Sequence, residues 1–375
     1  MHGGKPAYRL ALACICVVLL LPGTARALNY GQPGDPVHLV VGYQPYYTEA
    51  WSAVVMRGRQ FYAHYLPAGS TVSFYIGDRG LVLVQAIRSG RIQIGYFGDI
   101  PAVLSASGES PPARIVAVSG TSFTQCSILL VRRSAPQFPS SAALLHWLNG
   151  KRIAVPMQSC SERFLRDLLA QHGIHPGALF DQNLDTITAG LSGGALDAAA
   201  VWQPAGAQLA ALGDARIAAS GADFNWQDGG FLLMRADLIQ QRPDIVAAWL
   251  RAELDAQRFL ADPANSNAVI NMAQQQTFGY SREALWNALY AWPTAAVPPD
   301  PVIMQLDFGL TGAARSVLAR TAAFLERRGT LPPGADKPSV YDAAARQILA
   351  AEDLAAPIGR ITPQPRVSGS GQPRR

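Results

Sequence analysis

Polar turns that directly follow apolar runs are the positions in this chain where side chains could do chemistry. The segment 92–107, IQIGYFGDIPAVLSAS, joins a strand-like run to a small-residue helix that Pro101 opens. Gly98 permits a sharp turn, and Asp99 stands where a helix N-cap would stand. Backbone N–H groups at a helix start suit an anion, while a free carboxylate suits an amine. Asp99 is therefore either a helix cap alone or also part of a ligand site.

Two further polar turns lie in the first half of the chain. The segment VGYQPYY follows the first predicted strand and offers hydroxyl and amide groups on apolar rings: Tyr43, Gln44, Tyr46 and Tyr47. The segment SGTSFTQC follows the fourth predicted strand and begins with small polar residues that could surround an oxyanion: Ser119, Gly120, Thr121 and Ser122. Each turn also has a simpler interpretation, in which the tyrosines pack a surface and the second turn is an ordinary connection.

The second half contains comparable positions. The segment MQSCSER puts three small residues at a predicted helix start, where they cap the helix or hold an anion: Ser159, Cys160 and Ser161. Trp202, in VWQP, follows a strand and either belongs to the core or closes over a ligand. In DFNWQDGG, Asn225 and Asp228 are candidate rim or hinge residues, and the glycines fit a hinge.

The sequence carries no signature of an enzyme, a cofactor or a metal site. It contains no GxSxG elbow, HExxH motif, P-loop or dinucleotide fingerprint, and its six histidines are scattered. Cys126 and Cys160 are the only cysteines after residue 27, and they form no CxxC motif. We therefore expect a binding protein rather than an enzyme, with no cofactor and no bound metal.

The first 27 residues have the pattern of a secretory signal peptide. Lys5 and Arg9 precede the apolar run LALACICVVLLLP, and Ala25 and Ala27 form a small-residue cleavage site. The run is shorter than the ~20 apolar residues that span a membrane, so cleavage after Ala27 is favoured over an uncleaved anchor helix. This segment holds three of the 31 basic residues and no acidic one, which leaves 28 basic against 26 acidic residues. With no basic stripe among aromatics, nucleic acid is not an expected partner.

Strands alternate with amphipathic helices from about residue 37, which predicts a mostly parallel sheet covered by helices. A second α/β set begins after CSILLVRRS, and after residue 225 the chain starts with a strand and becomes mainly helical. A mature chain of about 350 residues exceeds what one hydrophobic core usually supports, so two lobes are expected. Ligands bind outside the carboxyl ends of strands in open α/β sheets, so two facing sheets would form a cleft.

Four segments, in order, resemble the periplasmic substrate-binding proteins of the nitrate, sulfonate and taurine class of ABC importers. Thiamine-precursor-binding proteins are near relatives of that class. The segments are SGRIQIGYFGDIPAV, LNGKRIAVPMQSCSERFLRDLLAQHGI, LSGGALDAAAVWQPAGAQL and FLLMRADLIQQRPDIVAAWLRAELDAQRFL. Together they cover roughly residues 37–260.

The resemblance implies an α/β, type II periplasmic binding protein fold, with two lobes, a ligand cleft and two hinge strands. Lobe 1 would contain residues 28–125 and 226–352, and lobe 2 would contain residues 126–225. Residues 353–375, rich in Pro, Gly, Ser and Arg, are expected to form a disordered tail. The strands in CSILLVRR and GGFLLMRA would be the two crossings.

In this architecture Cys126 and Cys160 both lie near the cleft. Two cysteines could pair in an oxidising compartment, although a bridge across moving lobes would hinder closure. Whether they form a disulfide is left open by the sequence.

The function that the resemblance implies is that of a monomeric periplasmic receptor. It would capture a small anionic or zwitterionic molecule of the sulfonate, taurine or nitrate kind, close around it, and present it to an inner-membrane ABC permease with its ATPase. Two alternatives stay open: a binder of a thiamine precursor or another heteroaromatic molecule, and a periplasmic accessory protein or enzyme with the same fold.

Overall fold

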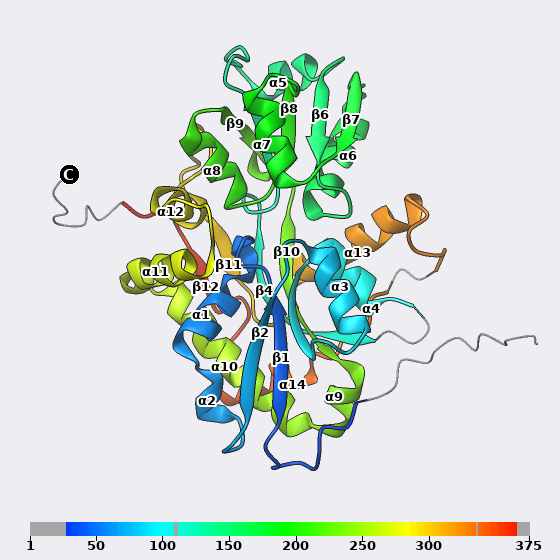
Figure 1. Ribbon diagram of the computed structural model, residues 1–375, viewed down its shortest axis with the longest axis vertical. Helices are drawn as coiled ribbons and strands as arrows, with labels where there is room; N and C mark the ends of the chain where they lie inside the picture. The colour runs from blue at the N-terminus through cyan, green and yellow to red at the C-terminus, as the bar shows by residue number, and fades with distance from the viewer. Residues whose placement is uncertain (1–27, 109–111, 335–336, 366–375) are drawn as a thin grey trace, which may run out of the picture.

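The computed structural model describes residues 28–108, 112–334 and 337–365, so the expected signal peptide lies outside the described residues. Two lobes, each built on one sheet, follow one another along the long axis of the molecule (Figure 1). Within the described ranges, no helix is both long enough and apolar enough to span a membrane.

The first sheet contains seven strands: β1 (His38–Tyr43), β2 (Thr71–Ile76), β3 (Ile94–Gly98), β4 (Ala113–Ser122), β10 (Asp228–Arg235), β11 (Met304–Leu306) and β12 (Gly359–Ile361). Their order across the sheet is β12-β11-β4-β10-β3-β1-β2. The helical segments of this lobe are η1 (Thr48–Ala50), α1 (Trp51–Arg59), α2 (Tyr62–Tyr65), α3 (Gly80–Arg88), α4 (Asp99–Ala106), α9 (Ala236–Gln241), α10 (Pro243–Ala261), η3 (Pro263–Asn265), α11 (Ser266–Gln276), α12 (Arg282–Tyr290), α13 (Gly312–Arg327) and α14 (Ala343–Ala351).

The second sheet contains five strands: β5 (Ile128–Arg132), β6 (Arg152–Val155), β7 (Ala178–Asp181), β8 (Ala198–Val201) and β9 (Ala215–Ser220). Their order is β7-β6-β8-β5-β9. The helical segments of this lobe are α5 (Ser141–Trp147), α6 (Cys160–Gln171), α7 (Leu184–Ser192), α8 (Ala205–Leu212) and η2 (Gly221–Phe224).

Both sheets are mixed, which corrects the prediction of mostly parallel sheets. β1 pairs in parallel with β2 and β3, as the alternation of strands and helices predicts. β10, however, runs antiparallel to both β3 and β4. The reason is that β10 enters the first sheet from the side of the second lobe, in the direction opposite to its neighbours.

The chain passes between the lobes through two short segments, residues 123–127 and 221–227, the second of which begins with η2. The two strands expected to be the crossings each belong to a single sheet, because β5 pairs only within the second sheet and β10 only within the first. The crossing segments pack closely together. A Cβ at Gly221 would meet the carbonyl oxygens of Phe123 and Trp226, so no side chain fits there.

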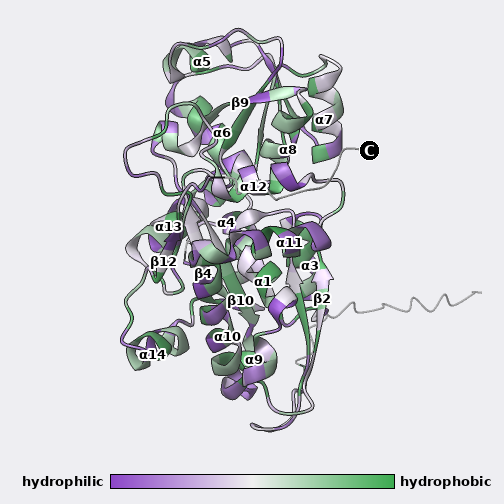
Figure 2. Cartoon of the chain, turned by 90° about the vertical axis from the view of Figure 1, so that its left-hand side faces the viewer, coloured by the Kyte–Doolittle hydropathy of each residue, from purple (hydrophilic) through white to green (hydrophobic). Residues whose placement is uncertain are grey.

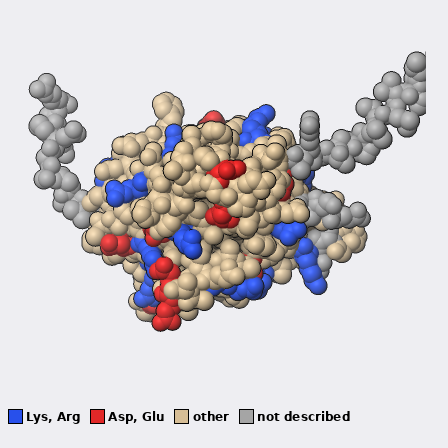
Figure 3. All heavy atoms as spheres, turned by 90° about the horizontal axis from the view of Figure 1, so that it is seen from below, with Lys and Arg blue, Asp and Glu red and all other residues tan. Residues whose placement is uncertain are grey.

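Apolar side chains fill both faces of the first sheet. Along β3, Tyr96 packs with the cluster that includes α1 and α10, whereas Phe97 packs with the cluster of α3, α4 and α13. This alternation is the period of two expected for a strand covered on both faces. Figure 2 shows hydrophobic stretches along the strands of both lobes. Seen from below, acidic and basic side chains are interspersed on the first lobe (Figure 3).

The C-terminal segment corrects the expectation of a disordered tail from residue 353. β12 pairs antiparallel with β11 and forms the edge of the first sheet. Ile361 is buried, and the N–H of Ile358 donates to the carbonyl of Leu306. A three-residue edge strand needs few apolar side chains, so the composition of this segment did not indicate it.

Candidate functional site

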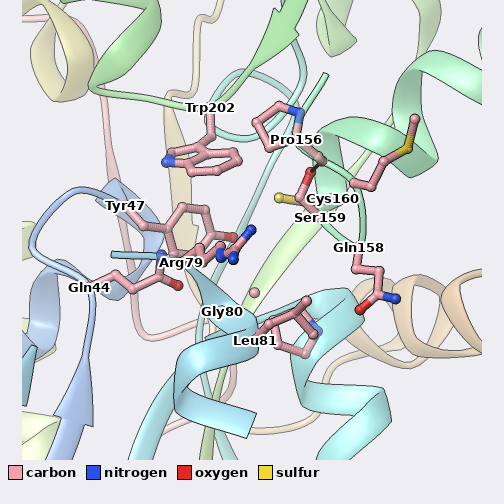
Figure 4. Close-up of a pocket in the computed structure, with 13 residues that line it drawn as sticks. Gln44, Tyr47, Arg79, Gly80, Leu81, Pro156, Gln158, Ser159, Cys160 and Trp202 are labelled. Atoms are coloured by element: carbon pink, nitrogen blue, oxygen red, sulfur yellow. Dashed lines mark hydrogen bonds between the residues drawn. The ribbon is translucent and has the colours of Figure 1, made fainter. Parts of the chain in front are cut away.

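A pocket of about 430 Å³, including its open mouth, lies between the lobes (Figure 4). The first lobe contributes Gln44, Tyr47, Arg79, Gly80, Leu81, Gly98 and Pro101. The second lobe contributes Pro156, Met157, Gln158, Ser159, Cys160 and Trp202. The pocket therefore combines loops and helix starts that are far apart in the sequence.

Three helices begin at this pocket. Gly80 is the first residue of α3, Gly98 is the N-cap of α4, and Cys160 is the first residue of α6. The first N–H groups of a helix have no partner within the helix, and its dipole is positive at that end. Three such ends around one space, two from the first lobe and one from the second, favour an anionic group.

Arg79 adds a formal positive charge to the pocket. It is the N-cap residue of α3, and in the described part of the chain its side chain makes no hydrogen bond or ion pair. No Asp or Glu is among the described residues that line this pocket. Arg79 was not predicted from the sequence, although its place between a predicted strand and a helix start in GDRG was a usable signal.

Aromatic side chains from both lobes form the apolar part of the pocket. Figure 4 shows the indole of Trp202 above the ring of Tyr47, with Arg79 beside the tyrosine. Trp202 is held across the lobes, because its Nε1 donates to the carbonyl of Tyr46 at 2.9 Å. These rings suit the carbon skeleton of a small ligand.

The start of α6 is held by its own side chains. The Ser159 hydroxyl accepts from the N–H of Glu162 at 3.2 Å and donates to the carbonyl of Pro156 at 2.6 Å. The Ser161 hydroxyl is buried and donates to the carbonyl of Cys126 at 2.8 Å. Both hydroxyls are thus engaged within the protein, and the groups that α6 offers to a ligand are backbone N–H groups.

Cys126 and Cys160 form a disulfide, with their Cα atoms 5.9 Å apart. Cys126 lies in the first crossing segment, and Cys160 begins α6 at the pocket. The bridge therefore fastens α6 to a crossing segment rather than one lobe to the other, so the objection that it would hinder closure does not apply. Among the described residues, no cluster of three or more His, Cys, Asp or Glu could hold a metal ion.

The Asp99 side chain lies behind the pocket wall rather than on it. Its Oδ2 forms a fully buried ion pair with Arg163 of α6, 2.6 Å from Nη2. Oδ2 also accepts from the Thr321 hydroxyl at 3.0 Å, and Oδ1 accepts from the N–H of Ile100 at 2.6 Å. Gly98 lines the pocket, whereas Asp99 joins α4 of one lobe to α6 of the other.

The residues of the expected tyrosine-rich turn, 43–47, lie in three different environments. Gln44 and Tyr47 line the pocket. Tyr43 is buried elsewhere, where its hydroxyl donates to Gln276 Oε1 at 2.7 Å and accepts from Arg57. Tyr46 lines an adjoining, wider cavity of about 1080 Å³, which shares Arg79, Pro156 and Trp202 with the first.

Residues 119–122, expected to form a polar turn after a strand, are the end of β4 itself and do not reach this pocket. The Thr121 hydroxyl donates to Asp307 Oδ2 at 2.8 Å, and the Ser122 hydroxyl donates to the carbonyl of Ile303 at 2.6 Å. A Cβ at Gly120 would lie 2.6 Å from the carbonyl oxygen of Gln305, and Ser119 is buried. This end of β4 instead holds the C-terminal segment that carries β11.

Asn225 lies away from the pocket as well. With Thr121 and Ser122 it lines a separate cavity of about 1190 Å³. Asp228 is buried at the start of β10 and accepts from the Ser127 hydroxyl at 2.6 Å. Of the fifteen residues expected at the site, five line the pocket between the helix starts: Gln44, Gly98, Ser159, Cys160 and Trp202. Their role in binding stays a prediction.

Residues 32–274 match the NMT1-like family, and the chain belongs to this family. It is 28% identical over 312 residues to the taurine-binding periplasmic protein of Escherichia coli strain K12. That alignment covers 81% of this chain and 91% of the relative. The predicted resemblance to the taurine and sulfonate class of binding proteins is confirmed.

Solved structures confirm the predicted fold class. The alkanesulfonate-binding protein SsuA from Xanthomonas axonopodis pv. citri, bound to MOPS, has a TM-score of 0.65 and 22% identity, covering 84% of this chain and 100% of SsuA. The periplasmic nitrate-binding protein NrtA from Synechocystis PCC 6803 has a TM-score of 0.66 and 16% identity, covering 86% of this chain and 90% of NrtA. The chain therefore has the fold of periplasmic binding proteins.

Proposed function

We propose that this chain is the periplasmic receptor of an ABC importer and that its inter-lobe pocket binds a small organic sulfonate. The observation that carries the proposal is the meeting of three helix N-termini and Arg79 in a pocket whose described lining residues include no Asp or Glu. The names of the relatives support the ligand class, since one binds taurine and another binds alkanesulfonates.

Each part of the pocket has a separate role in this proposal. The sulfonate oxygens accept from the first N–H groups of α3 and α6 and from the N–H of Asp99 in α4, and Arg79 neutralises the charge. In α4 only this one group is offered, because the Ile100 N–H is bonded to Asp99 and Pro101 has none. Tyr47 and Trp202 pack on the carbon atoms. Because no carboxylate is among the described residues that line the pocket, the amine of taurine is not required for binding.

Closure follows from the same contacts. α6 and Trp202 belong to the second lobe, whereas α3, α4 and Arg79 belong to the first. A ligand that touches both sets favours the closed form by its difference in affinity for the two forms. The closed monomer then docks on an inner-membrane permease with its ATPase, after export directed by residues 1–27.

A ligand screen on the mature protein tests the proposal. We expect ethanesulfonate and taurine to raise the melting temperature, while hydroxymethylpyrimidine does not. A ligand at a hundred times its Kd adds about 2.7 kcal/mol to the free energy of unfolding. Ethanesulfonate should bind within about tenfold of taurine, a difference under about 1.4 kcal/mol. Stabilisation by the pyrimidine alone would instead support a thiamine-precursor binder.

A further inference from the structure

A chain of buried hydrogen bonds leads from the pocket to both crossing segments. Tyr47 lines the pocket, and its hydroxyl donates to Oε2 of Glu49 in η1. The Glu49 carboxyl lies beside that of Asp228, at the end of the second crossing segment, close enough for the charge of Asp228 to raise the pKa of Glu49. Asp228 Oδ2 accepts from the Ser127 hydroxyl at 2.6 Å and from the N–H of Cys126 at 3.2 Å, both in the first crossing segment.

The carboxyl groups of Glu49 and Asp228 each have one oxygen atom that receives no hydrogen bond in the described part of the chain. Glu49 Oε1 and Asp228 Oδ1 are buried, and neither has a hydrogen-bond donor among the described residues. Glu49 packs directly on β10, two residues from Asp228, because a Cβ at Gly230 would lie 2.9 Å from the carbonyl oxygen of Glu49 and 3.1 Å from its Cβ. Two neighbouring, buried carboxylates repel each other and lose their hydration. A single proton between the two remaining oxygens satisfies both.

The charges that face this pair also favour a retained proton. Asp99 of α4 adds a third carboxyl, and Arg163 of α6 is the buried cation, already paired with Asp99. Burial and the charge of Asp228 raise the pKa of Glu49 well above its ordinary value. Burial also raises the pKa of Asp228, to about 6, so Glu49 is the group that keeps the proton near neutral pH.

We propose that Glu49 is a positioning residue of the binding site, whose carboxyl holds a proton shared with Asp228 and thereby couples Tyr47 in the pocket to the crossing segments. The Tyr47 proton is directed to Glu49, so the tyrosine turns its lone pairs, not its O–H, toward other partners. The sulfonate oxygens therefore lie at the helix starts, and the part of the ligand beside the Tyr47 oxygen is apolar or a hydrogen-bond donor. The placement of the ligand rests on the proposed function, whereas the proton shared by Glu49 and Asp228 does not depend on it.

Loss of the shared proton weakens binding. The two carboxylates then repel, and the contacts of Asp228 with Ser127 and Cys126 are disturbed at the hinge. Glu49→Gln is the matched test, because its amide oxygen accepts from Tyr47 and its amide nitrogen donates to Asp228, as protonated Glu49 does. Asp228→Asn supplies the missing donor from the other side. Glu253→Gln is the control, since Glu253 is also fully buried but bonds Tyr96 and Gln257 of the core.

Infrared spectroscopy of the ligand-free protein tests the proton directly. Near pH 8, about two units above the pKa of about 6 to which burial raises Glu253, the protein should show the carbonyl band of one protonated carboxylic acid. The band should disappear in Glu49→Gln and persist in Glu253→Gln. A spectrum that Glu49→Gln leaves unchanged overturns the proposal, whatever the ligand is.

Calorimetric titration with ethanesulfonate then tests the coupling. The wild-type affinity should fall by up to about tenfold per pH unit above the pKa of the pair, because one proton is linked to binding. Glu49→Gln, and Asp228→Asn if the first variant does not fold, should bind with a flat pH profile. The same slope in wild type and variant overturns the coupling. If ethanesulfonate does not bind wild type at all, the proposed function fails, and the infrared band still decides the proton.

Discussion

At the scale of single residues, Arg79 is the side chain on which the choice of an anionic ligand most depends. We expect Arg79→Gln to weaken ethanesulfonate binding by about 1.5–3 kcal/mol, the usual worth of a hydrogen bond to a charged group. The free energy of unfolding should hardly change, because the Arg79 side chain has no partner among the described residues. Calorimetry and urea unfolding measure the two quantities.

The matched control is Arg91→Gln, in the same lobe. The Arg91 guanidinium lies over the ring of Tyr75, 5.8 Å from its centre, and does not line the pocket. Equal losses of affinity in the two variants would mean that only the overall charge of the lobe matters. An unchanged affinity in Arg79→Gln would remove Arg79 from the site.

Residues near the pocket could be predicted from the sequence only where the feature that places them there lies within a few neighbouring residues. Gly98, Ser159 and Cys160 were predicted because a strand end followed by a helix start is visible in a few residues. The buried ion pair was not, because Arg163 has the appearance of an exposed helical residue and its partner Asp99 is 64 positions away. Glu49 was missed for the same reason, since its partners are Tyr47 and the distant Asp228.

At the scale of elements, α4 and α6 are joined by the ion pair of Asp99 with Arg163, both fully buried. We expect Arg163→Met to lower the free energy of unfolding by about 3–5 kcal/mol, because it leaves a buried carboxylate without its cation. Adding Asp99→Asn should recover part of this loss. Urea unfolding of the two single variants and the double variant gives the coupling energy. Purely additive effects would show that the pair does not join the helices.

The disulfide between Cys126 and Cys160 holds the start of α6 to a crossing segment across 34 residues of sequence. A loop of this size predicts a contribution of about 3–4 kcal/mol to the free energy of unfolding. We expect Cys126→Ser with Cys160→Ser to lose most of this stability. Affinity should change less, because Ser159 still caps α6 and Ser161 still bonds residue 126. Urea unfolding with and without reductant measures the loss of stability. A loss of affinity larger than the loss of stability would contradict the expectation for binding.

The existence of the strands was predicted better than the order in which they pair within the sheets. The alternation of strands and helices indicated β1 to β4 and β6, because that pattern is local. It could not indicate that β11 pairs with the end of β4, since Gln305 pairs with Thr121 across 184 positions. That pairing is why residues 119–122 continue β4 and hold the C-terminal segment instead of forming a turn that lines the pocket.

At the scale of the whole molecule, buried acids set the pH dependence of stability. Burial raises the pKa of Glu253 to about 6, and that of Glu49 well above its ordinary value. The folded form therefore binds more protons than the unfolded chain above about pH 4.5, so stability falls as pH rises through these raised pKa values. Asp237, whose pKa Arg235 and backbone hydrogen bonds lower despite burial, acts in the opposite sense and loses its contribution below about pH 4.

These opposing effects predict a stability maximum between about pH 4 and about pH 4.5, where the lowered pKa values no longer matter and the raised ones do not yet act. Urea midpoints measured from about pH 3 to about pH 8 check this expectation. The combination of Glu49→Gln with Glu253→Gln should flatten the decline on the alkaline side and leave the acid side unchanged. A wild-type midpoint that rises steadily toward alkaline pH would contradict the assignment of these two glutamates.

The central claim is that the pocket between the lobes binds an organic sulfonate at the three helix starts. A crystal structure of the mature protein with ethanesulfonate tests it most directly. We expect the sulfonate oxygens to accept from the first N–H groups of α3 and α6, from the N–H of Asp99 in α4 and from Arg79, with the ethyl group between Tyr47 and Trp202. A sulfonate bound instead in the cavity lined by Thr121, Ser122 and Asn225, or none between the lobes at a saturating concentration, would contradict the account.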